Sequence, residues 1–242
     1  MADAVTTPIG TIVPLYIYPS NGSWQPLIDQ KLRHPNVEVV AAVNPASGPG
    51  LAEDKNYTDG IKSLAAAGIL PIGYVSTIHG MRPESAVQND IKAWRALYPE
   101  VKGIFFDEQD NQPGMVGYYT DVSAYAKGMD YQLTVGNPGT MWIDPGYFNA
   151  LDVILVYETA AMPDAMEFQQ RLSMVARSQC GIIPYAVGTL DPAQVITASK
   201  WVQYVYVSEL GLPNPWKQLP SYLDSLFSTL DGQPASATTP SL

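Results

Sequence analysis

Three carboxylates at the ends of two apolar runs are the residues of this sequence best suited to chemistry. Asp107 and Glu108 follow the run 101–106, and Glu158 follows the run 152–157. A near-continuous apolar run is typical of a buried parallel strand, and α/β barrels place their catalytic groups at the carboxyl ends of such strands. Two acids that face each other across a cleft are the minimal equipment of a glycoside hydrolase.

These acids also have a structural interpretation, in which one of them caps a helix or pairs with an arginine. An acid buried without a partner has a raised pKa and weakens the fold, so active sites are the usual place for it. Because side chains alternate along a strand, only one of Asp107 and Glu108 can share the orientation of Phe105, and the other lies with Phe106. At the strand end both remain within reach of the mouth of the sheet.

A second set of polar and aromatic residues lies at or near the predicted strand ends and is suited to binding a sugar. Carboxylates and amides bind hydroxyl groups, while aromatic faces cover the apolar side of a sugar ring. A single tyrosine here is more often core packing, Asn-Pro pairs commonly begin turns, and His79 is either a general base or a loop residue. The predicted substrate-binding residues are Tyr16, Tyr18, Asn44, Tyr74, His79, Asn137, Tyr185 and Tyr206.

The elements that must position these residues are eight apolar, strand-like runs. Segments with apolar residues at helical spacing separate them, and this alternation predicts a parallel sheet. Eight repeats in 242 residues favour closure into a single (β/α)₈ TIM barrel over an open sheet. The runs are 11–18, 37–43, 69–75, 101–106, 131–135, 152–157, 181–187 and 202–207, and the clearest helical segments are 59–67, 86–98, 121–129, 163–178 and 192–199.

Local signals mark the helix ends and the domain limits. Pro83 and Pro192 suit the first positions of helices, and Gly68 suits the position just after a helix. We expect an N-terminal extension over 1–9 and a barrel domain over 10–230. The Pro-, Ser- and Thr-rich segment 231–242 should be a disordered tail.

The acidic net charge limits the classes of binding partner. A net charge of −10 and a pI near 4.5 argue against nucleic acid, which needs clustered basic residues. The charge suits a cationic polysaccharide, or it only keeps the protein soluble. His34 is the only histidine besides His79, so no metal-ligand spacing is present, and we expect neither a metal nor a cofactor.

The remaining features bear on compartment and assembly. Cys180 is the single cysteine, which excludes an intrachain disulfide. No apolar run reaches the roughly 18 residues of a membrane span, and no signal peptide is visible at the start. The protein is therefore expected to be extracellular if a leader was removed and cytoplasmic otherwise, and we expect a monomer.

Several motifs in one order resemble the spherulin-4 family, also called spherulation-specific family 4, over roughly residues 10–230. They are PLYIYP at 14–19, VNPASGPG at 43–50, GYVST at 73–77 with Arg82, GIFFDE at 103–108, NPG at 137–139 and Tyr157-Glu158. The resemblance implies a (β/α)₈ glycoside hydrolase related to enzymes that cut α-1,4-linked galactosamine and N-acetylgalactosamine polymers such as galactosaminogalactan. The family's acidic pair and its later glutamate fall on Asp107, Glu108 and Glu158.

The placement of the acids predicts a retaining hydrolysis with Asp107 as nucleophile, Glu158 as general acid and base, and Glu108 in support. The resemblance implies an endo-acting enzyme. A carboxyl separation of about 5 to 5.5 Å would fit retention, and one of about 6.5 to 9.5 Å would fit inversion. The sequence departs from the family pattern at Ser76, near His79 and at Ser208-Glu209, so part of the sugar-binding lining differs. The alternative is a non-catalytic carbohydrate-binding or dormancy-associated protein on the same barrel.

Overall fold

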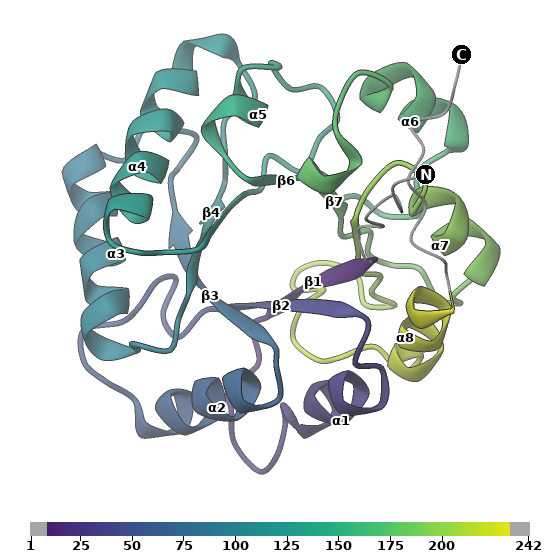
Figure 1. Cartoon of the computed structure of the whole chain (residues 1–242), viewed down its shortest axis with the longest axis horizontal. Coiled ribbons are helices and arrows are strands. Elements are labelled where there is room, and N and C mark those ends of the chain that lie inside the picture. The colour runs from purple at the N-terminus through teal and green to yellow at the C-terminus, as the bar shows by residue number, and fades with distance from the viewer. Residues whose placement is uncertain (1–8, 233–242) are drawn as a thin grey trace, which may run out of the picture.

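The computed structural model describes residues 9–232, and these form a closed barrel of parallel strands (Figure 1). The strands follow one another around the barrel in chain order, and β8 pairs with β1 to close it. This confirms the predicted (β/α)₈ barrel. The strands are β1 (Gly10–Leu15), β2 (Glu38–Val43), β3 (Leu70–Ser76), β4 (Gly103–Asp107), β5 (Leu133–Gly136), β6 (Val153–Tyr157), β7 (Cys180–Ile182) and β8 (Tyr204–Val205).

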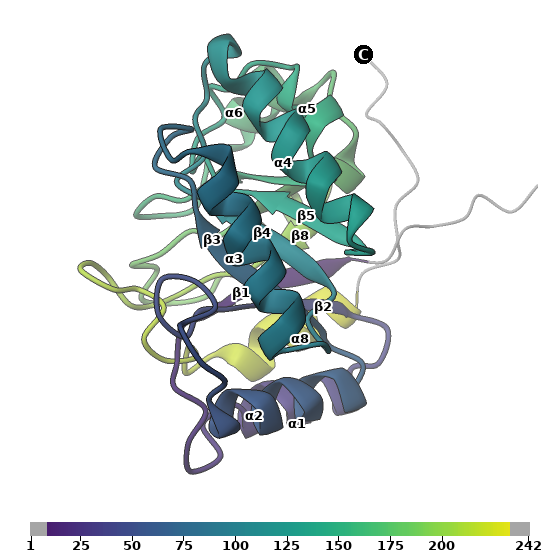
Figure 2. The same cartoon turned by 90° about the vertical axis from the view of Figure 1, so that its left-hand side faces the viewer.

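Helices surround the ring of strands, as seen in Figure 1, where the view runs along the barrel axis. In the side view of Figure 2, the longer loops project from the end of the barrel where the strands finish. The helices are α1 (Gln25–Arg33), α2 (Lys55–Ala66), α3 (Glu84–Leu97), α4 (Val116–Gly128), α5 (Tyr147–Ala150), α6 (Ala165–Leu172), α7 (Pro192–Ala198) and α8 (Leu223–Asp231), with single 3₁₀ turns η1 (Pro113–Met115) and η2 (Arg177–Gln179).

The packing of β3 shows which strand face points into the barrel. Gly73 faces the helical layer, because a Cβ atom there would lie 2.5 Å from the Trp94 ring of α3. The Trp94 indole is fully buried and donates a hydrogen bond of 2.9 Å to the carbonyl of Tyr74. Since side chains alternate along a strand, the side chain of Tyr74 points into the barrel.

Helix boundaries follow the predicted signals in part. Pro192 lies in the first turn of α7, and Gly68 adopts a φ of +79° directly after the last residues of α2. Pro83 precedes α3 as its N-cap instead of opening the helix. The helix expected over 163–178 is shorter, because α6 ends at Leu172 and a separate 3₁₀ turn, η2, begins at Arg177. The Arg177 side chain donates a hydrogen bond of 2.6 Å to the carbonyl of Ser199.

The last two strands are shorter than their apolar runs. β7 ends at Ile182, two residues before Pro184, which has no N–H to donate to a ladder. The extension 1–9 and the tail 231–242 lie almost entirely outside the described residues. None of the helices within residues 9–232 combines the length and apolar character that a membrane span requires.

Candidate active site

The end of β4 presents Asp107 to the mouth of the barrel. The rings of Tyr74 and Phe105 stack with centroids 6.2 Å apart, which places Phe105 on the inner face. Asp107 follows two residues later on the same face. Glu108 belongs to the opposite face, but its φ of +54° turns the chain, and its carboxylate accepts a hydrogen bond from the Ser76 hydroxyl at the end of β3. Both members of the pair therefore lie at the mouth.

Asn137 joins the acid of β4 to the acid of β6. Its position after β5 is fixed by its backbone N–H, which donates a hydrogen bond of 2.9 Å to the carbonyl of Phe106. The side-chain nitrogen donates to Asp107 Oδ1 at 2.9 Å and to Glu158 Oε2 at 2.6 Å. Because both oxygens contact one nitrogen, they are at most about 5.5 Å apart, within the spacing of retaining glycosidases.

Glu158 reaches this position through an irregularity in β6. The register between β6 and β7 shifts between Leu155 and Tyr157, and such bulges re-aim side chains next to active sites. The backbone N–H of Glu158 donates to the carbonyl of Gly139 at 3.1 Å. Gly139 has a φ of +65°, and a Cβ atom there would lie 3.4 Å from the Cβ of Glu158. The close approach of these two loops therefore favours glycine at 139.

Burial raises the pKa of the two bridged acids. The pKa of Glu158 rises to about 7, mainly by desolvation and also by the charge of Asp107, while hydrogen bonds from Asn137 and Trp216 oppose the rise. Desolvation also raises the pKa of Asp107, against hydrogen bonds from Asn137 and Tyr74. None of the ion pairs formed within residues 9–232 involves either acid. A buried acid that keeps its proton near neutral pH beside one supplied with hydrogen-bond donors is the pattern of an acid and nucleophile pair.

Two tyrosines of the inner face line the same space. Tyr16, just after β1, packs edge-to-face on Tyr74 at 5.6 Å between centroids. Burial raises the pKa of both phenols, and the charge of Asp107 raises them further. Both hydroxyls therefore stay protonated, and that of Tyr74 donates to Asp107.

A buried threonine hydroxyl contacts the backbone carbonyls of both members of the acidic pair. The Thr77 hydroxyl lies 2.8 Å from the carbonyl oxygen of Asp107 and 2.9 Å from that of Glu108, and 2.7 Å from the hydroxyl of Tyr119. His79 also contributes through its backbone, whose N–H donates to the Glu108 carbonyl at 2.8 Å. Ile78 and His79 both adopt positive φ angles, 48° and 52°, a strained arrangement for a β-branched residue. The His79 ring itself is exposed on this loop.

Four of the predicted substrate-binding residues do not join the acids. The Tyr18 hydroxyl bonds instead to Asp54 and Asn56 at the start of α2. The Asn44 side-chain oxygen accepts the backbone N–H of Gly48 and shapes its own loop. Tyr206 is only 1% exposed and packs on Trp216 at 5.9 Å between centroids, and Tyr185 meets the same indole edge-on at 6.4 Å. Tyr206 therefore supports the site without reaching its surface.

Trp216 is the main residue that the sequence reasoning missed. It lies in the long loop between β8 and α8, is 6% exposed, and its indole hydrogen-bonds Glu158. The loop is held by Ser208, whose hydroxyl donates to the Pro215 carbonyl at 2.8 Å, and by Glu209, which accepts from Ser221. The only sequence signal was the segment 206–222, which is too long for a simple turn between a strand and a helix.

No group of three or more His, Cys, Asp or Glu side chains within residues 9–232 is placed to hold an ion. The site consists of carboxylates, one bridging amide and phenols.

The fold and the site together define a (β/α)₈ barrel protein with a paired-carboxylate centre at the carboxyl ends of its strands. The chain belongs to the spherulation-specific family 4, whose model matches residues 10–230. Spherulin-4 of Physarum polycephalum is 36% identical over 155 residues, which is 63% of this chain and 46% of that protein. The match thus spans about half the length of that curated relative.

Solved structures give the same fold. The crystal structure of Aspergillus clavatus Sph3 in complex with GalNAc is similar with a TM-score of 0.84 and 26% identity, covering 93% of this chain and 98% of Sph3. The GH36 α-galactosidase AgaA of Geobacillus stearothermophilus is similar with a TM-score of 0.62 and 11% identity, covering 93% of this chain and 41% of AgaA. The second likeness concerns the fold alone.

Proposed function

We propose that this protein is a retaining, endo-acting glycoside hydrolase that cleaves α-1,4-linked galactosamine and N-acetylgalactosamine polymers. The observation that carries the proposal is the Asn137 amide, which bridges Asp107 and Glu158 and holds their oxygens at most about 5.5 Å apart. That spacing supports retention over inversion, for which the two carboxyl groups lie about 6.5 to 9.5 Å apart.

In the first step, the Asp107 carboxylate attacks C1 of the sugar and the bond from C1 to the glycosidic oxygen breaks. Glu158 gives its proton to the leaving oxygen, which its raised pKa allows near neutral pH. The hydrogen bonds from Asn137 and Tyr74 favour the charged form of Asp107 that the attack requires. The product of this step is a glycosyl ester on Asp107.

In the second step, the Glu158 carboxylate takes a proton from water. The water oxygen attacks C1, the bond between C1 and Asp107 breaks, and Glu158 is protonated again for the next cycle. Two displacements at C1 leave its configuration unchanged. Glu108, whose carboxylate is held by the Ser76 hydroxyl, orients the sugar and adds a second carboxylate beside Asp107.

Two observations support the polymer. Sph3, which shares this fold closely, was crystallised with GalNAc. Large exposed apolar side chains also gather on the loops that follow the strands, where they suit the apolar faces of sugars along a chain; they include Tyr18, Leu51, Ile78, Met81, Trp142 and Leu212. The net charge of −10 suits a partly deacetylated, cationic polymer by steering that weakens with salt.

The test is a product-release assay on α-1,4-linked galactosamine polymers of graded acetylation. The parent protein should release short oligosaccharides, whereas Asp107→Asn and Glu158→Gln should each lower the rate by at least about 1,000-fold, since each removes one half of the acid and nucleophile pair. Both replacements keep the size of the side chain, so circular dichroism should be unchanged.

The same assay separates hydrolysis from binding alone. A carbohydrate-binding protein would retain the polymer on a pull-down and release no shorter products. Variants that hydrolyse as fast as the parent would contradict the assignment of the two acids.

A further inference from the structure

A cavity of about 410 Å³ lies between the loop after β5, the end of β6 and helix α6. Part of its lining is Gly139, whose carbonyl binds the backbone N–H of Glu158, and Tyr157, the neighbour of that acid. Trp142 and Arg171 of α6 also line it. The volume lies within the range of ligand-binding pockets. The cavity therefore lies next to the residues that adjoin Glu158, and it borders a feature that the mechanism does not use.

That feature is a stacked pair of Trp142 and Arg171 at the surface. The Trp142 side chain is 66% exposed, which is unusual for the largest apolar side chain. The guanidinium carbon of Arg171 lies 3.0 Å from the centre of the indole ring. Among residues 9–232, no carboxylate pairs with this guanidinium and no carbonyl accepts a hydrogen bond from it. Its N–H donors are free to bind a ligand.

Hydrogen bonds hold the loop that carries Trp142 from two sides. The backbone N–H of Trp142 donates to the Thr140 hydroxyl at 3.1 Å, and the Trp142 carbonyl accepts from the Asn111 side chain at 2.9 Å. The N–H of Asp144 donates to the Asn111 carbonyl at 3.1 Å. These bonds hold the backbone that carries the indole before any ligand arrives, which lowers the cost of binding.

Trp142 and Arg171 also border a second cavity of about 450 Å³ on the side of Pro145 and Gln112. The stacked pair is thus a ridge between two hollows, and the first of these is lined by Gly139 and Tyr157, which adjoin Glu158. A sugar ring suits the ridge chemically, because its C–H face packs on an aromatic ring and its hydroxyl oxygens accept hydrogen bonds from a guanidinium.

We propose that Trp142 and Arg171 form a distal sugar-binding subsite, which takes an uncharged pyranose unit of the same polysaccharide chain that the acids cleave. The unit is uncharged because the unpaired Arg171 repels an ammonium group. This inference rests on the proposed function for the identity of the polymer. It assigns to the protein a second contact with substrate outside the catalytic centre.

The test measures binding against chain length in the Glu158→Gln variant, so that no substrate is consumed. The probe is a ladder of α-1,4-linked N-acetylgalactosamine oligosaccharides, titrated by calorimetry. The dissociation constant should fall in a step of about tenfold once the chain is long enough to reach the ridge, as one added aromatic stack provides. Trp142→Ala in the same background should abolish the step, and Arg171→Gln should reduce it.

Met174→Ala is the matched control, because Met174 is 94% exposed but lines neither cavity. It should keep the full step. A step that persists in the Trp142→Ala variant would overturn the subsite, as would equal weakening at every length or the absence of binding at any length. Failure of the parent protein to hydrolyse the polymer would instead refute the proposed function, and the binding step would still be measurable.

Discussion

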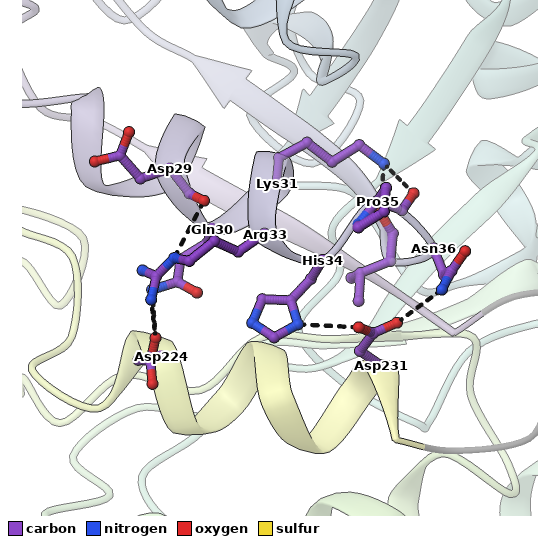
Figure 3. Close-up of polar contacts among 10 residues, drawn as sticks. Asp29, Gln30, Lys31, Arg33, His34, Pro35, Asn36, Asp224 and Asp231 are labelled. Atoms are coloured by element: carbon purple, nitrogen blue, oxygen red, sulfur yellow. Dashed lines mark hydrogen bonds and ion pairs between the residues drawn. The ribbon is translucent and has the colours of Figure 1, made fainter.

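Two groups of carboxylates in this barrel lie in opposite electrostatic settings. At the mouth, Asp107 and Glu158 share one amide and have no cationic partner among the described residues. At the junction of α1 and α8, called here the α1–α8 seam, each acid is paired, as Figure 3 shows. Arg33 contacts Asp224 at 2.6 Å, and His34 contacts Asp231 at 3.0 Å.

The α1–α8 seam joins the first helix of the barrel to the last one. Asn36 donates a further hydrogen bond of 3.2 Å to Asp231, and Gln30 donates one of 3.2 Å to Asp224. Lys31 turns back to the carbonyls that follow α1, at 2.9 and 2.8 Å. The acids of the seam therefore hold these two neighbouring helices together.

The direction of the pKa shift separates acids that stabilise the fold from acids that serve the proposed chemistry. A hydrogen bond from Gln30 and the charge of Arg33 lower the pKa of Asp224, so its charged form stabilises the fold. Burial raises the pKa of Glu158 to about 7, so its charged form weakens the fold. An arrangement that costs stability is kept where chemistry needs it.

The substitution with the largest expected effect on this comparison is at Asn137. Its side-chain amide contacts both acids at the mouth, which have no cationic partner among the described residues. We expect Asn137→Ala to lower kcat by about 100-fold, as loss of a group that orients catalytic residues often does. Its hydrogen bond lowers the pKa of Glu158, so its removal should also move the alkaline limb of the pH profile upward. Rates measured across pH report both effects.

Asn36→Ala is the matched control, since it removes an amide that binds a seam acid instead. Its pH profile should be that of the parent. An Asn137→Ala variant with lowered activity but an unshifted alkaline limb would show that the amide acts on folding alone.

The next effect concerns stability and pH. The folded protein holds the Glu158 proton more tightly than the unfolded chain, because the pKa rises from 4.5 to about 7. The contribution of Glu158 to stability is therefore full below about pH 4.5 and is lost as pH rises through about 7. At about 1.4 kcal/mol per pKa unit, the loss is about 3 kcal/mol. Glu158→Gln should escape it, so urea unfolding at about pH 8 should find this inactive variant more stable than the parent.

Asp224→Asn should behave in the opposite way. The lowered pKa of Asp224 gives stability that is present above its unfolded pKa and lost as pH falls, so the substitution should weaken the fold at neutral pH and have no effect in acid. If Glu158→Gln and Asp224→Asn shifted stability in the same direction at pH 8, the contrast between the two regions would fail.

The smallest effect lies within the α1–α8 seam. Asp231 and His34 have side chains that are 25% and 16% exposed, whereas Arg33 and Asp224 are 57% and 62% exposed. Since exposed pairs contribute little, Asp231→Asn should cost about 1 kcal/mol of unfolding free energy and more than Asp224→Asn. Both variants should hydrolyse substrate at the parental rate. Calorimetric unfolding and the product-release assay check the two statements.

The barrel was predictable from sequence because its signal is repeated. Each apolar run is buried on both faces, so it reads as a strand without knowledge of its neighbours, and the closed order of strands follows from their number. The short α5 was not predicted, and the run 202–207 was placed correctly but forms only the two-residue β8, since such lengths depend on packing that periodicity does not record.

The site was predictable only where it lies on a strand end. Asp107, Asn137 and Glu158 each follow a strand, and the fold brings them together. Trp216 lies in a long loop, and its contact with Glu158 depends on how that loop returns to the mouth. The positive φ of Glu108 likewise reflects contacts with Thr77 and Ser76 rather than any local preference of glutamate.

The most direct test of the central claim is the configuration of the first product released. Proton NMR of the anomeric region during early hydrolysis of an α-1,4-linked N-acetylgalactosamine oligosaccharide distinguishes the two outcomes before mutarotation mixes them. Two acids bridged by one amide predict that the α-anomer appears first. Initial release of the β-anomer would show a single displacement and would contradict the roles assigned to Asp107 and Glu158.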